Sequence, residues 1–112
     1  MIEGDVQPTV RTPRPRITPQ SVPRLPRHVK LRHDKTRDRW VILVPERVLL
    51  PDDTAVAVLL RVDGARRVCD IVDELASLYH ADPALILTDS IALLQDLADK
   101  AFLQTVTEPP DA

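Results

Sequence analysis

The stretch LVPERVLLPDDTA, residues 43–55, decides the fold of this chain. It reads as an apolar strand, a corner at Pro45-Glu46, a second very short apolar strand and then the start of a helix. The second strand is apolar at three consecutive positions, residues 48–50. A strand with one buried face alternates apolar and polar residues. This strand is therefore predicted to be covered on both faces or to await a partner that covers it.

Two strands are predicted before the corner. The first places Val29, Leu31 and His33 on one face and basic residues on the other. Residues 34–38 (DKTRD) form a polar hairpin loop, and residues 39–44 (RWVILV) form the partner strand. The short strand after the corner then becomes the third strand of the sheet.

Three helices are predicted after the sheet. The first begins at the capping pair Asp52-Asp53 and is closed by Gly64. The second spans residues 68–80, with its apolar residues on one face. The third begins with Asp82-Pro83, a capping residue followed by proline at the first helical position, and continues to Lys100.

The chain divides into three parts. Residues 1–26 contain six prolines and few large apolar side chains, which predicts a Pro-rich flexible tail or interdomain linker. Residues 27–106 form the domain, with a short extended segment at its end, and residues 107–112 are a frayed C-terminus. The predicted fold class is α+β, a small winged helix-turn-helix-like domain with three short antiparallel strands followed by three helices.

Composition restricts the class of protein further. The chain has 112 residues, one cysteine and no apolar run of membrane-spanning length, which predicts one small cytoplasmic domain with no membrane partner. Lys and Arg outnumber Asp and Glu eleven to five in residues 1–50, whereas Asp and Glu outnumber them ten to four in residues 51–100. Such a split can orient a charged partner, although it also suits a surface whose charges balance within one fold.

Catalysis has little support in the sequence. The side chains that could act as nucleophile or base are scattered, namely Cys69, His28, His33, His80 and Tyr79. His28 and His33 are five positions apart in a strand, so they point to opposite faces and cannot share a metal. With two glycines, the chain has no Gly-rich phosphate loop. We therefore predict a protein that is not an enzyme and has no cofactor or metal.

The second and third helices also fit the helix-turn-helix of a nucleic-acid-binding or regulatory domain. The third helix, however, carries four acidic residues against one lysine, namely Asp82, Asp89, Asp96 and Asp99 against Lys100. Affinity for a duplex comes mainly from phosphate neutralisation by Lys and Arg, so this helix would repel the phosphates. Nucleic-acid binding stays as the alternative function.

Peptide capture fits the sequence better. The third strand, residues 47–50, should lie at the sheet edge, where an extended peptide can add as a further strand. Arg47 could pair with an acidic side chain of that peptide. The third helix would supply the other wall of the groove through Ile86, Ser90, Leu93 and Leu94. The competing interpretation is that residues 48–50 are core, and part of this set is expected to be so.

The same residues resemble a known family. Residues 43–55, then Leu59-Leu60 and Asp63-Gly64, and the closing stretch LQDLADKAFL at residues 94–103, are similar to the PqqD family. The resemblance extends over residues 25–103, which is nearly all of the predicted domain, and leaves the Pro-rich segment outside.

This resemblance implies a non-catalytic peptide chaperone in the biosynthesis of pyrroloquinoline quinone. It would bind the ribosomally made precursor PqqA as an added strand and present it to PqqE, a radical S-adenosylmethionine enzyme that cross-links a Glu and a Tyr of the peptide. The family's peptide site carries over to Arg47, Val48, Leu49, Leu50, Ile86, Asp89, Ser90 and Leu93. PqqE needs another surface, and the candidate is the basic hairpin, with Lys30, Arg32, Arg37 and Arg39.

The chain departs from the family pattern at two places. Where the family commonly has Leu-Asn before the first helix, this chain has Pro51-Asp52, and aspartate can cap the helix equally well. The family commonly has Gly where this chain has Ala101, and Ala is disfavoured in a left-handed cap, so the third helix is expected to end differently or to continue further. The Pro-rich segment is unusual for a standalone member. In some organisms PqqD is fused behind PqqC, the last enzyme of the pathway, and residues 1–26 would suit such a linker.

Overall fold

The computed structural model describes residues 15–106. The elements in this part of the chain are β1 (Pro23–Arg24), β2 (Lys30–Asp34), β3 (Arg39–Val44), β4 (Arg47–Leu49), α1 (Asp53–Leu59), α2 (Val68–Tyr79), α3 (Pro83–Asp99) and β5 (Gln104–Thr105). The three predicted strands are β2, β3 and β4, and the three predicted helices follow them. The α+β class and the order of these six elements are confirmed.

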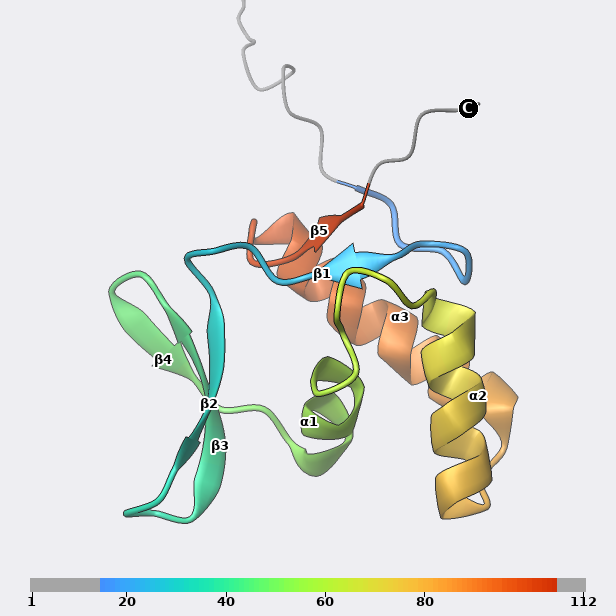
Figure 1. Ribbon diagram of the computed structural model, residues 1–112, viewed down its shortest axis with the longest axis horizontal. Coiled ribbons are helices and arrows are strands. Elements are labelled where there is room, and N and C mark those ends of the chain that lie inside the picture. Colours follow the sequence, from blue (N-terminus) through green and yellow to red (C-terminus); the bar gives the residue numbers. More distant parts are fainter. Residues whose placement is uncertain (1–14, 107–112) are drawn as a thin grey trace, which may run out of the picture.

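The antiparallel sheet has the order β2-β3-β4 and stands beside the helices (Figure 1). Leu31 lies opposite Ile42, and Ile42 lies opposite Leu49, so these three side chains share the face that packs on the core. The loop between β2 and β3 is held by Asp34, whose carboxylate accepts the N–H groups of Thr36 and Arg37 at 3.1 and 3.3 Å.

The aspartates predicted as helix caps perform that role. Oδ1 of Asp52 accepts the N–H of Ala55 at 2.8 Å, and Oδ1 of Asp82 accepts the N–H of Ala84 at 2.9 Å. The expected end of the first helix needs correction, because α1 stops at Leu59 and Gly64 does not close it. Gly64 lies in the following loop with φ of 78°, where its N–H donates to the carbonyl of Pro23.

The structure also corrects the expected start of the domain. Residues 15–26 do not form a free linker, because Ile17 is buried in the core and β1 pairs with β5. Pro23 lies opposite Thr105 in that pair. Figure 1 shows β1 and β5 side by side across one end of the helices. The remaining residues of the expected tail and frayed end, 1–14 and 107–112, lie outside the described residues.

The N-terminal segment completes the start of α2. The helix begins after Arg67, which has no side-chain oxygen to accept the first N–H groups. The carbonyl of Ser21 accepts the N–H of Val68, and the carbonyl of Pro19 accepts the N–H of Cys69, both at 2.9 Å. Residues far away in sequence therefore supply the N-terminal cap that the local sequence lacks.

The third helix ends at Asp99 through a left-handed alanine. Ala101 has φ of 67°, its N–H donates to the carbonyl of Ala98, and the N–H of Phe102 donates to the carbonyl of Leu97 at 2.8 Å. This pair of bonds defines a Schellman cap, which glycine usually closes. The expectation that the helix ends differently or runs further is therefore wrong: the cap forms with Ala101 in the strained position.

One continuous core joins the sheet, the three helices and both ends of the described chain. Its largest fully buried aliphatic side chains include Val58 of α1, Ile71 and Leu75 of α2, Leu94 of α3, and Leu103 in the segment after α3. A domain of this size buries a limited amount of apolar surface, so most members of the core are expected to matter for stability.

Candidate functional site

The third strand of the sheet, β4, is an edge strand with exposed apolar side chains. Among residues 15–106 it pairs only with β3. Val48 is 52% exposed and Leu50, directly after the strand, is 62% exposed, whereas Leu49 is half-buried against the core. Leu49 therefore packs on the core, as the competing interpretation predicts, whereas Val48 and Leu50 do not. An apolar edge of this kind is a template for another extended chain.

The hairpin geometry indicates which backbone groups face that edge. A two-residue turn, Pro45-Glu46, joins β3 to β4, so the flanking pair Val44–Arg47 is hydrogen-bonded. The next pair, Leu43–Val48, is then non-hydrogen-bonded, and the N–H and C=O of Val48 point away from β3. An incoming strand would therefore pair first with the backbone of Val48.

A hollow adjoins the end of β4 between α1 and α3. We call it the α1–α3 pocket; it has a volume of about 340 Å³ and is lined by Leu50, Pro51, Asp52, Thr54, Ala55, Val58, Asp89, Ser90 and Leu93. Four of the predicted site residues, Leu50, Asp89, Ser90 and Leu93, are thus brought together. The wall contributed by α1 was missed from the sequence, although the capping Asp52 marked where that helix begins.

Ser90 is the one fully buried polar side chain among the predicted site residues. Its exposed fraction is 0%, and its Oγ has no hydrogen-bond partner within the described part of the chain. A buried hydroxyl without a partner costs roughly 1–3 kcal/mol, so its position beside a pocket requires an explanation.

Arg47 and Ile86 lie apart from the α1–α3 pocket. The guanidinium of Arg47 is 5.6 Å from the centre of the Phe102 ring, a cation–π distance that fixes this exposed side chain at the start of β4. Ile86 lines a separate hollow of about 250 Å³ with Ala57, Leu75 and Tyr79. Arg47 therefore stays beside the edge strand, whereas Ile86 faces another part of the surface.

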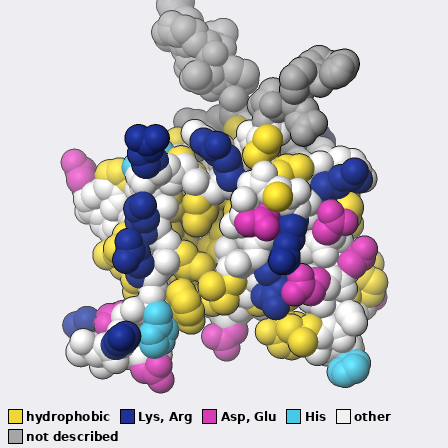
Figure 2. Space-filling model, in the orientation of Figure 1, with side chains coloured by type: hydrophobic (Ala, Val, Ile, Leu, Met, Phe, Trp, Pro, Cys, Tyr) yellow, Lys and Arg dark blue, Asp and Glu magenta, His cyan; other side chains and the backbone are white. Residues whose placement is uncertain are grey.

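The predicted partner-enzyme residues are concentrated on the outer face of the sheet. The pairings Lys30–Leu43 and Arg32–Val41 place these two cations opposite apolar residues of β3, and Arg39 lies on the same face. Leu43 in turn lies opposite Val48, and both are exposed. Figure 2 shows Lys and Arg side chains down the left side of the molecule, over the sheet. Arg37 lies in the loop, 3.5 Å from Asp34.

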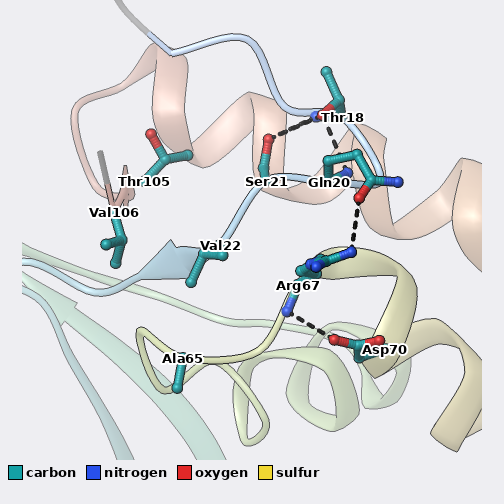
Figure 3. Close-up of a pocket in the computed structure, with 9 residues that line it drawn as sticks. All are labelled: Thr18, Gln20, Ser21, Val22, Ala65, Arg67, Asp70, Thr105 and Val106. Carbon is teal, nitrogen blue, oxygen red and sulfur yellow. Dashed lines mark hydrogen bonds between the residues drawn. The ribbon is translucent and has the colours of Figure 1, made fainter. Parts of the chain in front are cut away.

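A further hollow, of about 840 Å³, has a different character. It lies where the N-terminal segment crosses the start of α2, and Figure 3 shows its polar side chains pointing at one another. Arg67 donates to Oε1 of Gln20 at 3.1 Å, and Asp70 accepts the N–H of Arg67 at 3.3 Å. These groups are occupied in holding the segment in place, and none of the predicted site residues lines this hollow.

The residues considered for catalysis remain scattered in the structure. His33 contacts Asp38 at 3.2 Å, His28 contacts the carbonyl of Ala101, and Cys69 is half-buried in α2. Within residues 15–106, no three His, Cys, Asp or Glu side chains group as metal ligands. The helices described for this chain are too short or too polar to cross a membrane.

The fold and this geometry define a class: a small α+β binding domain in which, among residues 15–106, one edge of the sheet is unpaired and lies beside a hollow that can receive side chains of an extended polypeptide. Comparison with known proteins identifies the family. The family model described as coenzyme PQQ synthesis protein D (PqqD) matches residues 39–103, more than half of the chain, and the chain belongs to this family.

Individual relatives support the same family assignment. A protein of Rhodopseudomonas palustris (strain BisB5) named PqqA binding protein is 60% identical over 92 residues, which cover 82% of this chain and 90% of that protein. The bifunctional coenzyme PQQ synthesis protein C/D of Methylorubrum extorquens (strain AM1) is 49% identical over 83 residues, covering 74% of this chain and 22% of that protein.

A solved structure shares the fold. The solution structure of the PqqD part of Methylobacterium extorquens PqqCD, described as a functional and stand-alone recognition element for ribosomally synthesized and post-translationally modified peptides, superposes with a TM-score of 0.70. It is 46% identical in sequence, and the match covers 79% of this chain and 94% of that one. The name of the Rhodopseudomonas protein describes binding, and the description of the Methylobacterium structure describes recognition.

Proposed function

We propose that this protein binds the precursor peptide PqqA by adding it as a strand to β4. The observation that carries the proposal is the exposed apolar edge, with Val48 52% and Leu50 62% exposed next to the α1–α3 pocket. Burial of these side chains by a peptide stabilises the complex, and main-chain hydrogen bonds to Val48 fix its register. Relatives named PqqA binding protein supply the identity of the peptide.

The mechanism we propose is scaffolding. A peptide held as a strand has lost much of its conformational freedom before it meets the modifying enzyme PqqE, and its effective concentration at that active site is raised. The bond-forming chemistry would belong to PqqE and its cofactors. We propose the cytoplasm as the compartment of this step, because its reducing conditions suit the free thiol of Cys69.

PqqE is proposed to dock on the outer face of the sheet. That face combines exposed Leu43 with the cations Lys30, Arg32 and Arg39, so it suits an acidic surface with an apolar centre. It is perpendicular to the β4 edge, and a peptide paired with β4 leaves most of it uncovered. A ternary complex of chaperone, peptide and enzyme is therefore geometrically allowed.

The test is a titration of isotope-labelled protein with synthetic PqqA, followed through backbone amide resonances. We expect the largest shifts at residues 47–50 and at Asp89, Ser90 and Leu93, because these amides line the edge and the pocket. No shift in a folded sample would refute peptide capture.

A short DNA duplex is the matched second ligand for the same sample. The acidic side chains of α3, including Asp89 and Asp96, make binding there unfavourable, so we expect no shifts on this helix. Shifts on α3 with DNA and none with PqqA would favour the nucleic-acid alternative.

A further inference from the structure

The rim and the floor of the α1–α3 pocket differ in chemistry. The buried side chains of Ala55 and Val58, with Leu50 and Leu93, give it apolar walls, and Asp52 and Asp89 stand at its exposed rim. No Lys or Arg is among the side chains that line this pocket. The pocket therefore combines apolar walls with two exposed carboxylates.

The two carboxylates retain unused acceptor capacity. Oδ1 of Asp52 is used to cap α1, by accepting the N–H of Ala55 at 2.8 Å. Within residues 15–106, the other oxygen of Asp52 and both oxygens of Asp89 take part in no hydrogen bond or ion pair. Two carboxylates beside one hollow favour a group that carries positive charge and several donors.

Ser90 provides an independent observation that points to a ligand. It lines the same pocket next to Asp89, is fully buried, and its Oγ has no partner among the described residues. A hydroxyl oxygen has two lone pairs, so it can accept a hydrogen bond from a donor placed in the pocket. A donor in the pocket would give the Ser90 Oγ the partner that it lacks, whereas an apolar occupant would leave it unsatisfied.

We propose that the α1–α3 pocket takes one cationic group of the bound peptide, an ammonium or guanidinium, between Asp52, Asp89 and Ser90. The inference rests on the proposed function, since the peptide strand on β4 delivers the group. Every second side chain of that strand points to the same face as Leu49 and so toward the helices. A lysine or arginine there lays its aliphatic stem on Leu50 and Leu93 and places its charge beside the two carboxylates. The volume of about 340 Å³ leaves room for a lysine or arginine side chain.

The test is a double-mutant cycle measured by calorimetry on the full chain. Synthetic PqqA is prepared with each Lys or Arg replaced in turn by norleucine, and separately with its N-terminal amine acetylated. Each peptide is titrated into the unaltered protein and into Asp89→Asn, which keeps the shape and removes the charge. Asp73→Asn, an exposed carboxylate of α2, is the matched control for net charge.

We expect one peptide change to weaken binding about tenfold in the unaltered protein and in Asp73→Asn, but less than about twofold in Asp89→Asn. If a norleucine replacement is the change that weakens binding, the cation is the side chain that was replaced. If acetylation is the change that weakens binding, the cation is the N-terminal ammonium. If every change costs the same with and without Asp89 while PqqA still binds, the pocket proposal is wrong and the proposed function stands. If PqqA does not bind the folded protein at all, both are wrong.

Discussion

Replacing Ala101 by glycine should make this protein more stable. Ala101 has φ of 67° and closes the Schellman cap of α3. The left-handed conformation costs an L-residue roughly 1–2 kcal/mol, and glycine avoids that cost. Glycine also increases the entropy of the unfolded chain, which reduces this gain in stability by about 0.4–1 kcal/mol. The net gain in free energy of unfolding is about 0.5–1 kcal/mol, or about 3–6 °C in Tm for a domain of this size.

The assay is urea unfolding followed by circular dichroism, with thermal unfolding beside it. Ala92→Gly is the matched control, because Ala92 lies exposed in the middle of α3, where glycine is expected to cost about 1 kcal/mol. The same substitution should therefore raise the free energy of unfolding at position 101 and lower it at position 92. A loss of stability in Ala101→Gly similar to that in Ala92→Gly would show that Ala101 is helical and refute the reasoning.

Two further perturbations test the site and the α1–α2 loop. Val48→Pro removes the N–H that faces the β4 edge, so the affinity for PqqA should fall at least about fivefold. Val48→Thr keeps that N–H, so its affinity for PqqA should stay within about twofold of that of the unaltered protein. Equal losses of affinity in the two variants would contradict strand addition. The N–H groups of Ala65 and Arg66, both 2.9 Å from Asp63, hold the pKa of its carboxyl below the ordinary 3.8. The stabilisation from this carboxylate is present above pH 3.8 and is lost as the pH falls through the lower pKa of the folded state. The difference in urea midpoint between the unaltered protein and Asp63→Asn should therefore shrink over that pH range. A difference that does not change with pH would refute this reasoning.

The sequence predicts the helices and the sheet well because their signals are local. Asp52 and Asp82 are capping residues placed directly before apolar periodic segments, and both accept the expected N–H groups. Residues 15–26 could not be predicted in the same way, because their contacts are distant in sequence: the N–H of Ile17 donates to the side chain of Gln95 at 2.8 Å. The absence of a capping side chain at Arg67 was the available signal that another segment covers the start of α2.

The candidate site was predictable where spacing alone determines neighbours. Asp89, Ser90 and Leu93 fall on one side of α3 by helical periodicity, and the structure brings them to one pocket. Ile86 lies on the same stripe as Ser90 but one turn away, about 6 Å along the helix axis, where it lines a hollow with Leu75. Which neighbouring element a helical residue faces depends on how the helices cross, and the spacing of residues within one helix does not reveal that crossing.

The pairing of β1 with β5 brings the N-terminal segment of the described residues beside their C-terminal end. The carbonyl of Val22 accepts the N–H of Val106 at 2.8 Å, so the polypeptide path is closed almost into a ring. A short peptide could join these ends, and new ends could be opened in the exposed loop at residues 35–38. We expect such a circular permutant to keep the core and the β4 edge, with the order of its elements along the chain changed and their arrangement in space preserved.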